Sequence, residues 1–237
     1  MSLVAFGTSF ASAQRQAVGA GQVVQALENH YRDAKTLTAD FLERYSEGDR
    51  QERVESGRVF FARPGHMRWE YESPETKLFV SDGRILWFYV PKDHSATHQL
   101  VKQSDDWRTP LALLTGEVKL SRLCGKIELD GGPPLSDGSV VLKCWPRGET
   151  SAATHAGQQS ESSALNAGDN FTEVLLEINP TSGELNDVRV EQPGGVELEF
   201  RFGAWRMNPP LASSLFEFEP LAGVAIVPAE PSSDSAP

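Results

Sequence analysis

Two neighbouring segments, 66–72 and 78–89, limit most strongly what this chain can fold into. In the first, every second residue from Met67 to Tyr71 is large and apolar and the residues between them are charged, so an extended chain presents one apolar face and one charged face. The second is apolar at both parities on either side of a turn at Asp82, which predicts a hairpin with hydrophobic contacts on both faces. Together the patterns predict a curved antiparallel sheet whose concave face is covered by a helix or by an apolar ligand.

The chain is long enough for a substantial core. Its 237 residues fit one large all-β domain or two small ones, and a domain of this size buries about 70% of the surface of its unfolded chain. The 33 acidic and 22 basic residues give a net charge of −11, which repels the phosphates of nucleic acids. The composition therefore argues against nucleic acid as a partner.

The boundaries of the folded part follow from composition. Residues 1–19 are expected to be a signal-peptide remnant or a disordered N-terminus, because Ala11-Ser12-Ala13 has the small-x-small form of a signal-peptidase site. An unstructured cytosolic N-terminus is the alternative. One domain is expected over 20–227, with a flexible insertion at 148–170 that is rich in Ser, Ala, Gly and Gln. The Pro- and Ser-rich acidic segment 228–237 is expected to be a disordered tail.

One long helix, one short helix and a series of strands are expected within this domain. Apolar residues at helical spacing predict an amphipathic helix over 21–35. A short apolar helix is expected at 109–115, where proline stands near the start. Its apolar residues are Pro110, Leu111, Leu113 and Leu114. Alternating patterns separated by turn residues predict strands at 36–47, 54–62, 66–72, 77–81, 84–90, 97–103, 117–129, 139–145, 171–179, 185–192 and 195–203.

The two cysteines lie on either side of an expected turn. Cys124 and Cys144 are equally far from Pro134 in sequence, so they face each other if 117–129 and 139–145 form a hairpin. A disulfide would fit an oxidising compartment such as the periplasm. Two buried free thiols are the alternative.

The sequence carries none of the motifs that mark common catalytic sites. A nucleophile elbow, a phosphate-binding loop, a dinucleotide fingerprint and a CxxC pair are all missing. His94 and His98 have the spacing of metal ligands on a helix, but Pro91 places them on a loop. Asp82 before a glycine is explained by a hairpin turn rather than by catalysis. We therefore expect no catalytic residue, no metal and no cofactor, in a protein that is not an enzyme.

Arg63 stands out because Pro64 follows it and restricts its backbone to an extended conformation. An arginine held on the inner side of a curved sheet could donate hydrogen bonds to the backbone carbonyls of a covering helix. An ordinary arginine at the rim of the sheet is the alternative. The pattern alone favours the rim arginine.

Several motifs along the chain resemble those of one family. They are Arg63-Pro64-Gly65, Arg68-Trp69-Glu70-Tyr71, Val80-Ser81-Asp82-Gly83, Leu86-Trp87-Phe88-Tyr89 and Phe216-Glu217-Phe218. Together with the order of the expected elements, they resemble the LolA family, the periplasmic carriers of outer-membrane lipoproteins, over roughly residues 20–227. The chain departs from the family pattern in the insertion at 148–170, the two cysteines and the acidic tail. It also has Met67 where phenylalanine is common in the family.

The resemblance implies a mainly β fold with a helical lid: an unclosed, strongly curved antiparallel β-barrel that encloses a hydrophobic cavity. It also implies that Arg63 is a latch that holds the lid closed over the empty cavity, in place of the rim arginine that the pattern favours. The residues expected to bind acyl chains in the cavity are Met67, Trp69, Tyr71, Trp87, Tyr89, Val196, Leu198 and Phe200. A shift of one residue in any strand would exchange its two faces.

The function that the resemblance implies is that of a periplasmic, monomeric chaperone that binds the acyl chains of lipoproteins and carries them from the inner to the outer membrane. Its implied partners are lipidated proteins, an inner-membrane ABC lipoprotein-release complex and an outer-membrane lipoprotein acceptor. The alternative is a periplasmic carrier or sensor of the same fold that binds free lipid or glycolipid. An esterase or glycosidase would need a Ser-His or paired-carboxylate site that cannot be assembled from the sequence.

Overall fold

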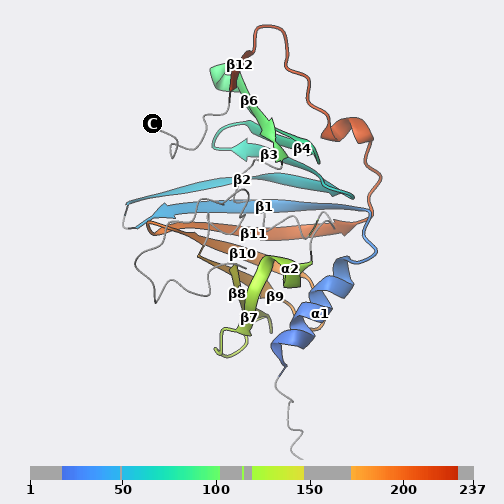
Figure 1. Cartoon of the computed structure of the whole chain (residues 1–237), viewed down its shortest axis with the longest axis vertical. Coiled ribbons are helices and arrows are strands. Elements are labelled where there is room, and N and C mark those ends of the chain that lie inside the picture. The colour runs from blue at the N-terminus through green and yellow to red at the C-terminus, as the bar shows by residue number, and fades with distance from the viewer. Residues whose placement is uncertain (1–17, 49, 102–113, 115–118, 147–171, 229–237) are drawn as a thin grey trace, which may run out of the picture.

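The computed structural model describes residues 18–48, 50–101, 114, 119–146 and 172–228 (Figure 1). Its helices are α1 (Ala20–Tyr31), α2 (Leu120–Leu123) and the 3-10 helices η1 (Pro91–Asp93) and η4 (Ser213–Phe216). Its strands are β1 (Thr36–Glu47), β2 (Arg50–Ala62), β3 (His66–Ser73), β4 (Lys77–Asp82), β5 (Ile85–Val90), β6 (Ser95–Leu100), β7 (Cys124–Leu129), β8 (Val140–Pro146), β9 (Glu173–Ile178), β10 (Leu185–Gln192), β11 (Val196–Met207) and β12 (Ala225–Pro228).

All the described strands belong to one sheet in the order β12-β6-β5-β4-β3-β2-β1-β11-β10-β9-β8-β7. Neighbouring strands are antiparallel except for β12, which is parallel to β6. The sheet is strongly curved and does not close, since β12 and β7 are its two edges (Figure 1). The predicted fold class, an unclosed and curved antiparallel β-barrel with few helices, is confirmed.

The core lies on the concave face of the sheet and is centred on Trp69. This side chain is fully buried and meets the rings of Phe41, Phe61 and Phe200 edge to face, with ring centroids 4.8, 6.1 and 5.5 Å away. Such aromatic pairs contribute about 0.5–1.5 kcal/mol each beyond the burial of their area. The alternation along β3 thus places its apolar side chains toward the core.

Gly57 allows two aromatic rings to meet across a strand that lies between them. It stands on β2 between Phe41 of β1 and Tyr71 of β3. A Cβ atom on Gly57 would lie 1.9 Å from the carbonyl oxygen of Glu70, so no other residue fits without moving the backbone. The rings of Phe41 and Tyr71 pack edge to face over this position, with centroids 5.0 Å apart.

The helix α1 packs beside the β7–β10 end of the sheet (Figure 1). Its residues Val23, Leu27 and Tyr31 recur every fourth position and are buried in the same core as the sheet. The helix ends at Tyr31, earlier than the predicted 21–35. The reason is that the backbone N–H of Lys35 donates to Oδ1 of Asn208, at 2.7 Å, as the chain turns into β1.

Several further elements differ from the predictions, among them β2, which begins at Arg50 rather than at residue 54. Part of the predicted strand 117–129 is the short helix α2, and only its second half is β7. The strand β12 was not predicted, because its few apolar residues stand next to the Pro-rich tail. The insertion 148–170 and residues 229–237 of the predicted tail lie outside the described residues. In the part of the chain that the structure describes, no helix has the length and apolar character needed to cross a membrane.

The two cysteines are joined by a disulfide between β7 and β8, with their Cα atoms 5.4 Å apart. They are not directly opposite in the ladder, because a register shift near the start of β7 places Cys144 opposite Ile127 and Cys124 opposite Pro146. The bond therefore runs diagonally across the pair of strands. It ties the edge strand β7 to the sheet.

Candidate functional site

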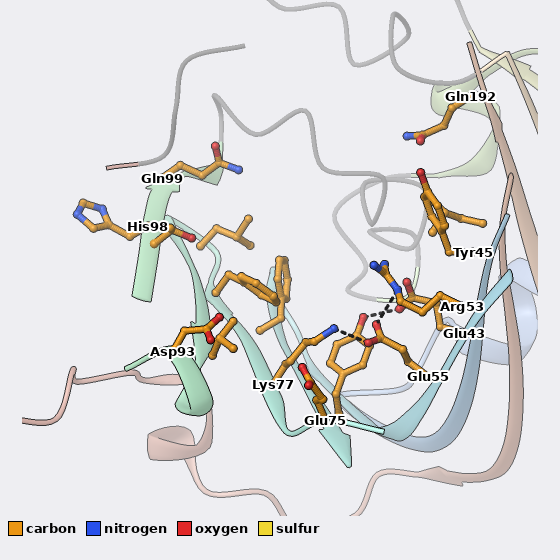
Figure 2. A pocket seen from close by; sticks show the side chains of 17 residues that line it. Glu43, Tyr45, Arg53, Glu55, Glu75, Lys77, Asp93, His98, Gln99 and Gln192 are labelled. Carbon is orange, nitrogen blue, oxygen red and sulfur yellow. Dashed lines mark hydrogen bonds and ion pairs between the residues drawn. The ribbon is translucent and has the colours of Figure 1, made fainter. Parts of the chain in front are cut away.

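A cavity of about 590 Å³ opens on the concave face toward the β1–β2 hairpin (Figure 2). Its apolar wall is formed mainly by Tyr71, Phe79, Leu86, Phe88 and Leu198. Charged and amide side chains border the same space, namely Glu43, Arg53, Glu55, Glu75, Lys77, Asp93, Gln99 and Gln192. The volume falls within the range of about 300–1,000 Å³ that is typical of small-molecule sites.

Most of the residues expected in the cavity share its face of the sheet, and these are Met67, Trp69, Tyr71, Val196, Leu198 and Phe200. Tyr71 and Leu198 line the cavity itself. Trp69 and Phe200 are fully buried in the adjoining core, and Met67 is partly buried against that core. Val196 is half-buried where β11 begins, opposite Glu47. The wall of the cavity and the core of the barrel are therefore one continuous apolar surface.

Trp87 and Tyr89 do not line the cavity, which corrects the expectation from the sequence. Both rings contact Phe218 of the C-terminal segment, with centroids 5.3 Å away in each case. Their neighbours Leu86 and Phe88 line the cavity instead. The strand is apolar at both parities because its second face is covered by the C-terminal segment, so the alternation did not show which set pointed inward.

Two polar pairs stand at the cavity wall, close to each other (Figure 2). The Tyr71 hydroxyl donates a hydrogen bond of 2.6 Å to Oε2 of Glu43, and Lys77 forms an ion pair with Glu55. Arg53 adds a longer ion pair to Glu55, at 3.6 Å. Both carboxylates are buried. These groups were not predicted from the sequence, although Glu43 and Glu55 occupy apolar positions in otherwise alternating strands.

Arg63 connects two separate parts of the chain that lie over the sheet. One guanidinium nitrogen, Nη1, donates to the carbonyl oxygen of Arg32 at the C-terminal end of α1, at 2.8 Å, and Nε donates to the carbonyl oxygen of Leu114 at 3.4 Å. Burial lowers the pKa of Arg63, and the nearby charge of Asp33 opposes this shift. Leu114 is fully buried in the core. Pro110, Leu111 and Leu113, the other residues of the predicted lid helix, lie outside the described residues.

The C-terminal end of α1 is fixed to the sheet at a second point. The backbone N–H of Leu185 donates to the Tyr31 hydroxyl at 3.1 Å, and Trp205 Nε1 donates to the Leu185 carbonyl at 2.9 Å. Burial raises the pKa of Tyr31. Gly183 lies directly under the helix, where a Cβ atom would be 2.2 Å from the carbonyl oxygen of Ala26. This end of α1 is held by side-chain packing and by backbone hydrogen bonds together.

Comparisons with known proteins agree with this architecture. The family model described as outer membrane lipoprotein carrier protein LolA matches residues 32–125, which include Arg63 and Leu114. An outer-membrane lipoprotein carrier protein of Chromobacterium violaceum is 30% identical over 194 residues, which cover 82% of each chain. The chain belongs to the LolA family. Another member, from Nitrosospira multiformis, is 29% identical over 214 residues and 89% of each chain.

The fold of this LolA-family chain is also found in a solved structure of low sequence identity. A conserved protein of Thermus thermophilus described as uncharacterized superposes with a TM-score of 0.52 at 12% identity, covering 89% of this chain and 99% of that one. This likeness concerns the arrangement of the strands and helices alone.

Proposed function

We propose that this chain is a periplasmic carrier that binds the acyl chains of lipoproteins in the concave cavity and transports lipoproteins from the inner to the outer membrane. The observation that carries the proposal is the position of Arg63, whose guanidinium joins α1 and Leu114 above the apolar core of a LolA-family sheet. The names of the relatives, which are lipoprotein carriers, support it.

The physical need for such a carrier follows from the size of an acyl chain. Burying one CH₂ group is worth about 0.8 kcal/mol, so a chain of about 16 carbons represents on the order of 10 kcal/mol of unfavourable contact with water. Cargo of this kind must be shielded while it crosses an aqueous compartment. The cavity wall of Phe79, Leu86 and Phe88 offers a continuous apolar surface for this purpose.

Release of the cargo requires that the empty state has favourable contacts of its own. The hydrogen bonds from Arg63 to the carbonyls of Arg32 and Leu114 are contacts of this kind. They would be broken when acyl chains enter and displace Leu114, so their loss offsets part of the energy gained by burial. The carrier then works as a monomer between an inner-membrane ABC release complex and an outer-membrane acceptor, without catalysis or a cofactor.

Native mass spectrometry with a triacylated lipopeptide in competition with a phospholipid tests this function. A carrier of lipoproteins should prefer the lipopeptide, whereas a carrier or sensor of free lipid should not. Phe88→Gln and Tyr89→Gln form a matched pair of variants, because the two residues are adjacent but only Phe88 lines the cavity. We expect Phe88→Gln to lose most lipopeptide binding and Tyr89→Gln to retain it. Equal binding by both variants, or a preference for phospholipid, would contradict the proposal.

A further inference from the structure

The wall of the cavity carries an ion pair where acyl chains alone would need only apolar side chains. Lys77 and Glu55 contact each other on this wall, and their side chains are only 17% and 5% exposed (Figure 2). A buried ion pair adds little net stability compared with apolar side chains of similar size. Its presence on a lipid-binding surface therefore points to a role other than stability.

The strand register gathers polar groups at one end of the cavity. Lys77 stands opposite Tyr71, and Glu55 stands opposite Glu43 in the neighbouring ladder. Two carboxylates placed directly across from each other repel, which makes this arrangement unfavourable for folding alone. The wall continues from there along Phe79 with apolar side chains. The buried charges of the cavity thus gather at one end, which we call the polar end, whereas Leu86 and Phe88 lie toward the other end beside Thr97 and Gln99.

We propose that the polar end holds the head of the lipid anchor, meaning the amide and ester groups that join acyl chains to a lipoprotein, while the chains lie along Phe79, Leu86 and Phe88. This inference rests on the carrier function proposed above. The Lys77 ammonium donates to a carbonyl oxygen, and the Glu55 carboxylate accepts from an amide N–H. Side by side, they offer one donor and one acceptor, which can bond to different amide and ester groups of the anchor.

The charge of the cavity favours an uncharged head over an anionic one. Among the described residues that line it, the carboxylates are Glu43, Glu55, Glu75 and Asp93, whereas Arg53 and Lys77 are the cationic side chains. A phosphate at this position would approach an excess of negative charge, which is a common way for a site to reject a competing ligand. Amide and ester groups carry no charge and do not meet this repulsion.

The experiment compares two probes on one double variant. The probes are a triacylated lipopeptide and an alkylpyrene, which has a hydrocarbon chain but neither amide nor ester. In Glu55→Leu/Lys77→Met the ion pair is replaced by apolar side chains of similar size, which buried sites often tolerate. We expect its affinity for the lipopeptide to fall about tenfold or more, as for the loss of a hydrogen bond to a charged group. Its affinity for alkylpyrene should stay within about twofold.

Two further variants separate the buried pair from ion pairs in general and from folding defects. Lys126→Met/Glu128→Leu removes an exposed ion pair of 3.0 Å on β7, outside the cavity, with side chains 55% and 52% exposed, and should bind both probes normally. The swapped pair Glu55→Lys/Lys77→Glu keeps one donor and one acceptor and should retain most of the lipopeptide affinity. Circular dichroism establishes that each variant is folded.

The outcomes distinguish this inference from the proposed function. If the unmodified protein binds the alkylpyrene but not the lipopeptide, the carrier function fails and the polar site fails with it. If the unmodified protein binds the lipopeptide and the buried-pair variant shows the same ratio of affinities, only the polar site is wrong. An equal loss of lipopeptide affinity in the Lys126/Glu128 variant would also overturn the site, because a general effect of removing charge would then explain the result.

Discussion

The two parts of the chain that Arg63 connects are held in different ways. The helix α1 buries three side chains, rests on Gly183 and receives hydrogen bonds at both Tyr31 and Arg32. Leu114 is equally buried, but the hydrogen bond from Arg63 to its carbonyl is longer, at 3.4 Å against 2.8 Å for Arg32. The difference indicates that α1 is a fixed wall, whereas Arg63 holds Leu114 less firmly. Five predictions challenge or refine this contrast.

Leu27→Ala should have the largest effect on stability. Leu27 is fully buried between α1 and the sheet, so its truncation should lower the free energy of unfolding by about 2–5 kcal/mol. Urea denaturation measures this, with the exposed Gln25→Ala on the same helix as the control. A loss of less than about 1 kcal/mol would mean that α1 is itself a loosely held lid.

Removal of the disulfide should have the next largest effect. Cys124→Ser/Cys144→Ser opens a loop defined by a separation of 20 residues, which predicts a loss of about 3 kcal/mol in the chain-entropy account. The edge strand β7 contacts α1, so this bond should support the fixed wall. Mass spectrometry after thiol alkylation of unreduced, denatured protein checks that the bond exists, since free thiols would add the mass of two labels.

Tyr31→Phe should loosen the end of α1 without changing its packing. The variant keeps the ring against Trp205 but leaves the Leu185 N–H without its acceptor, at a cost of about 1–2 kcal/mol. Amide hydrogen exchange should become faster in α1. Tyr45→Phe, whose hydroxyl makes only a bond of 3.5 Å at the surface, is the control and should exchange normally.

Arg63→Leu should alter transfer more than stability. The change removes hydrogen bonds to two carbonyls, for a loss of about 1 kcal/mol, and should favour the open form. A fluorescent lipopeptide should still load onto the variant but pass poorly to an outer-membrane acceptor. Arg58→Leu on the outer face serves as the control. Normal loading with normal release would end the idea of a latch, and a parallel loss of loading and transfer would indicate a purely structural arginine.

The last prediction concerns the pH dependence of stability at Asp187 on β10, which pairs with Arg201 of β11. Burial, together with the charge of Glu199, raises the pKa of Asp187 to about 7. The folded state therefore favours the protonated carboxyl, and the stability that it contributes is complete below the unfolded pKa near 3.8 and is lost as the pH rises through about 7. Asp187→Asn should flatten this dependence. Thermal melts between pH 4 and pH 8 measure it, and identical pH profiles would show that Asp187 does not titrate in this range.

Much of the fold was predictable because local patterns and turns agree with one another. The strand 36–47 was predicted with the bounds of β1, and 185–192 with those of β10. The faces of β5 could also have been derived. β4 and β5 pair across a short turn so that Ser81 stands opposite Leu86, and such pairing joins odd positions of one strand to even positions of the next. Trp69 and the other odd-numbered residues of β3 point toward the core. The same pairing rule therefore predicts that the even-numbered residues of β5 also point toward the core.

Other features depend on contacts between segments that are distant in sequence. No local sequence pattern predicts the pairing of β12 with β6 or the packing of Phe218 on Trp87, because in each case the two partners are more than a hundred residues apart in sequence. The buried pair of Lys77 and Glu55 resembles ordinary surface charge until the register brings the two strands together. Alternation shows that a strand has two faces, but only tertiary packing decides what covers each one.

The place of β1 in the sheet has a consequence for how this chain reaches its native state. β1 pairs on one side with β2, which follows it directly, but on the other side with β11, near the far end of the sequence. Non-local pairing of this kind makes folding slow. Until β11 is available, one edge of β1 is an unpaired template for aggregation next to its apolar residues. A protein proposed to protect the acyl chains of other proteins from water would thus itself need protection from aggregation while it folds.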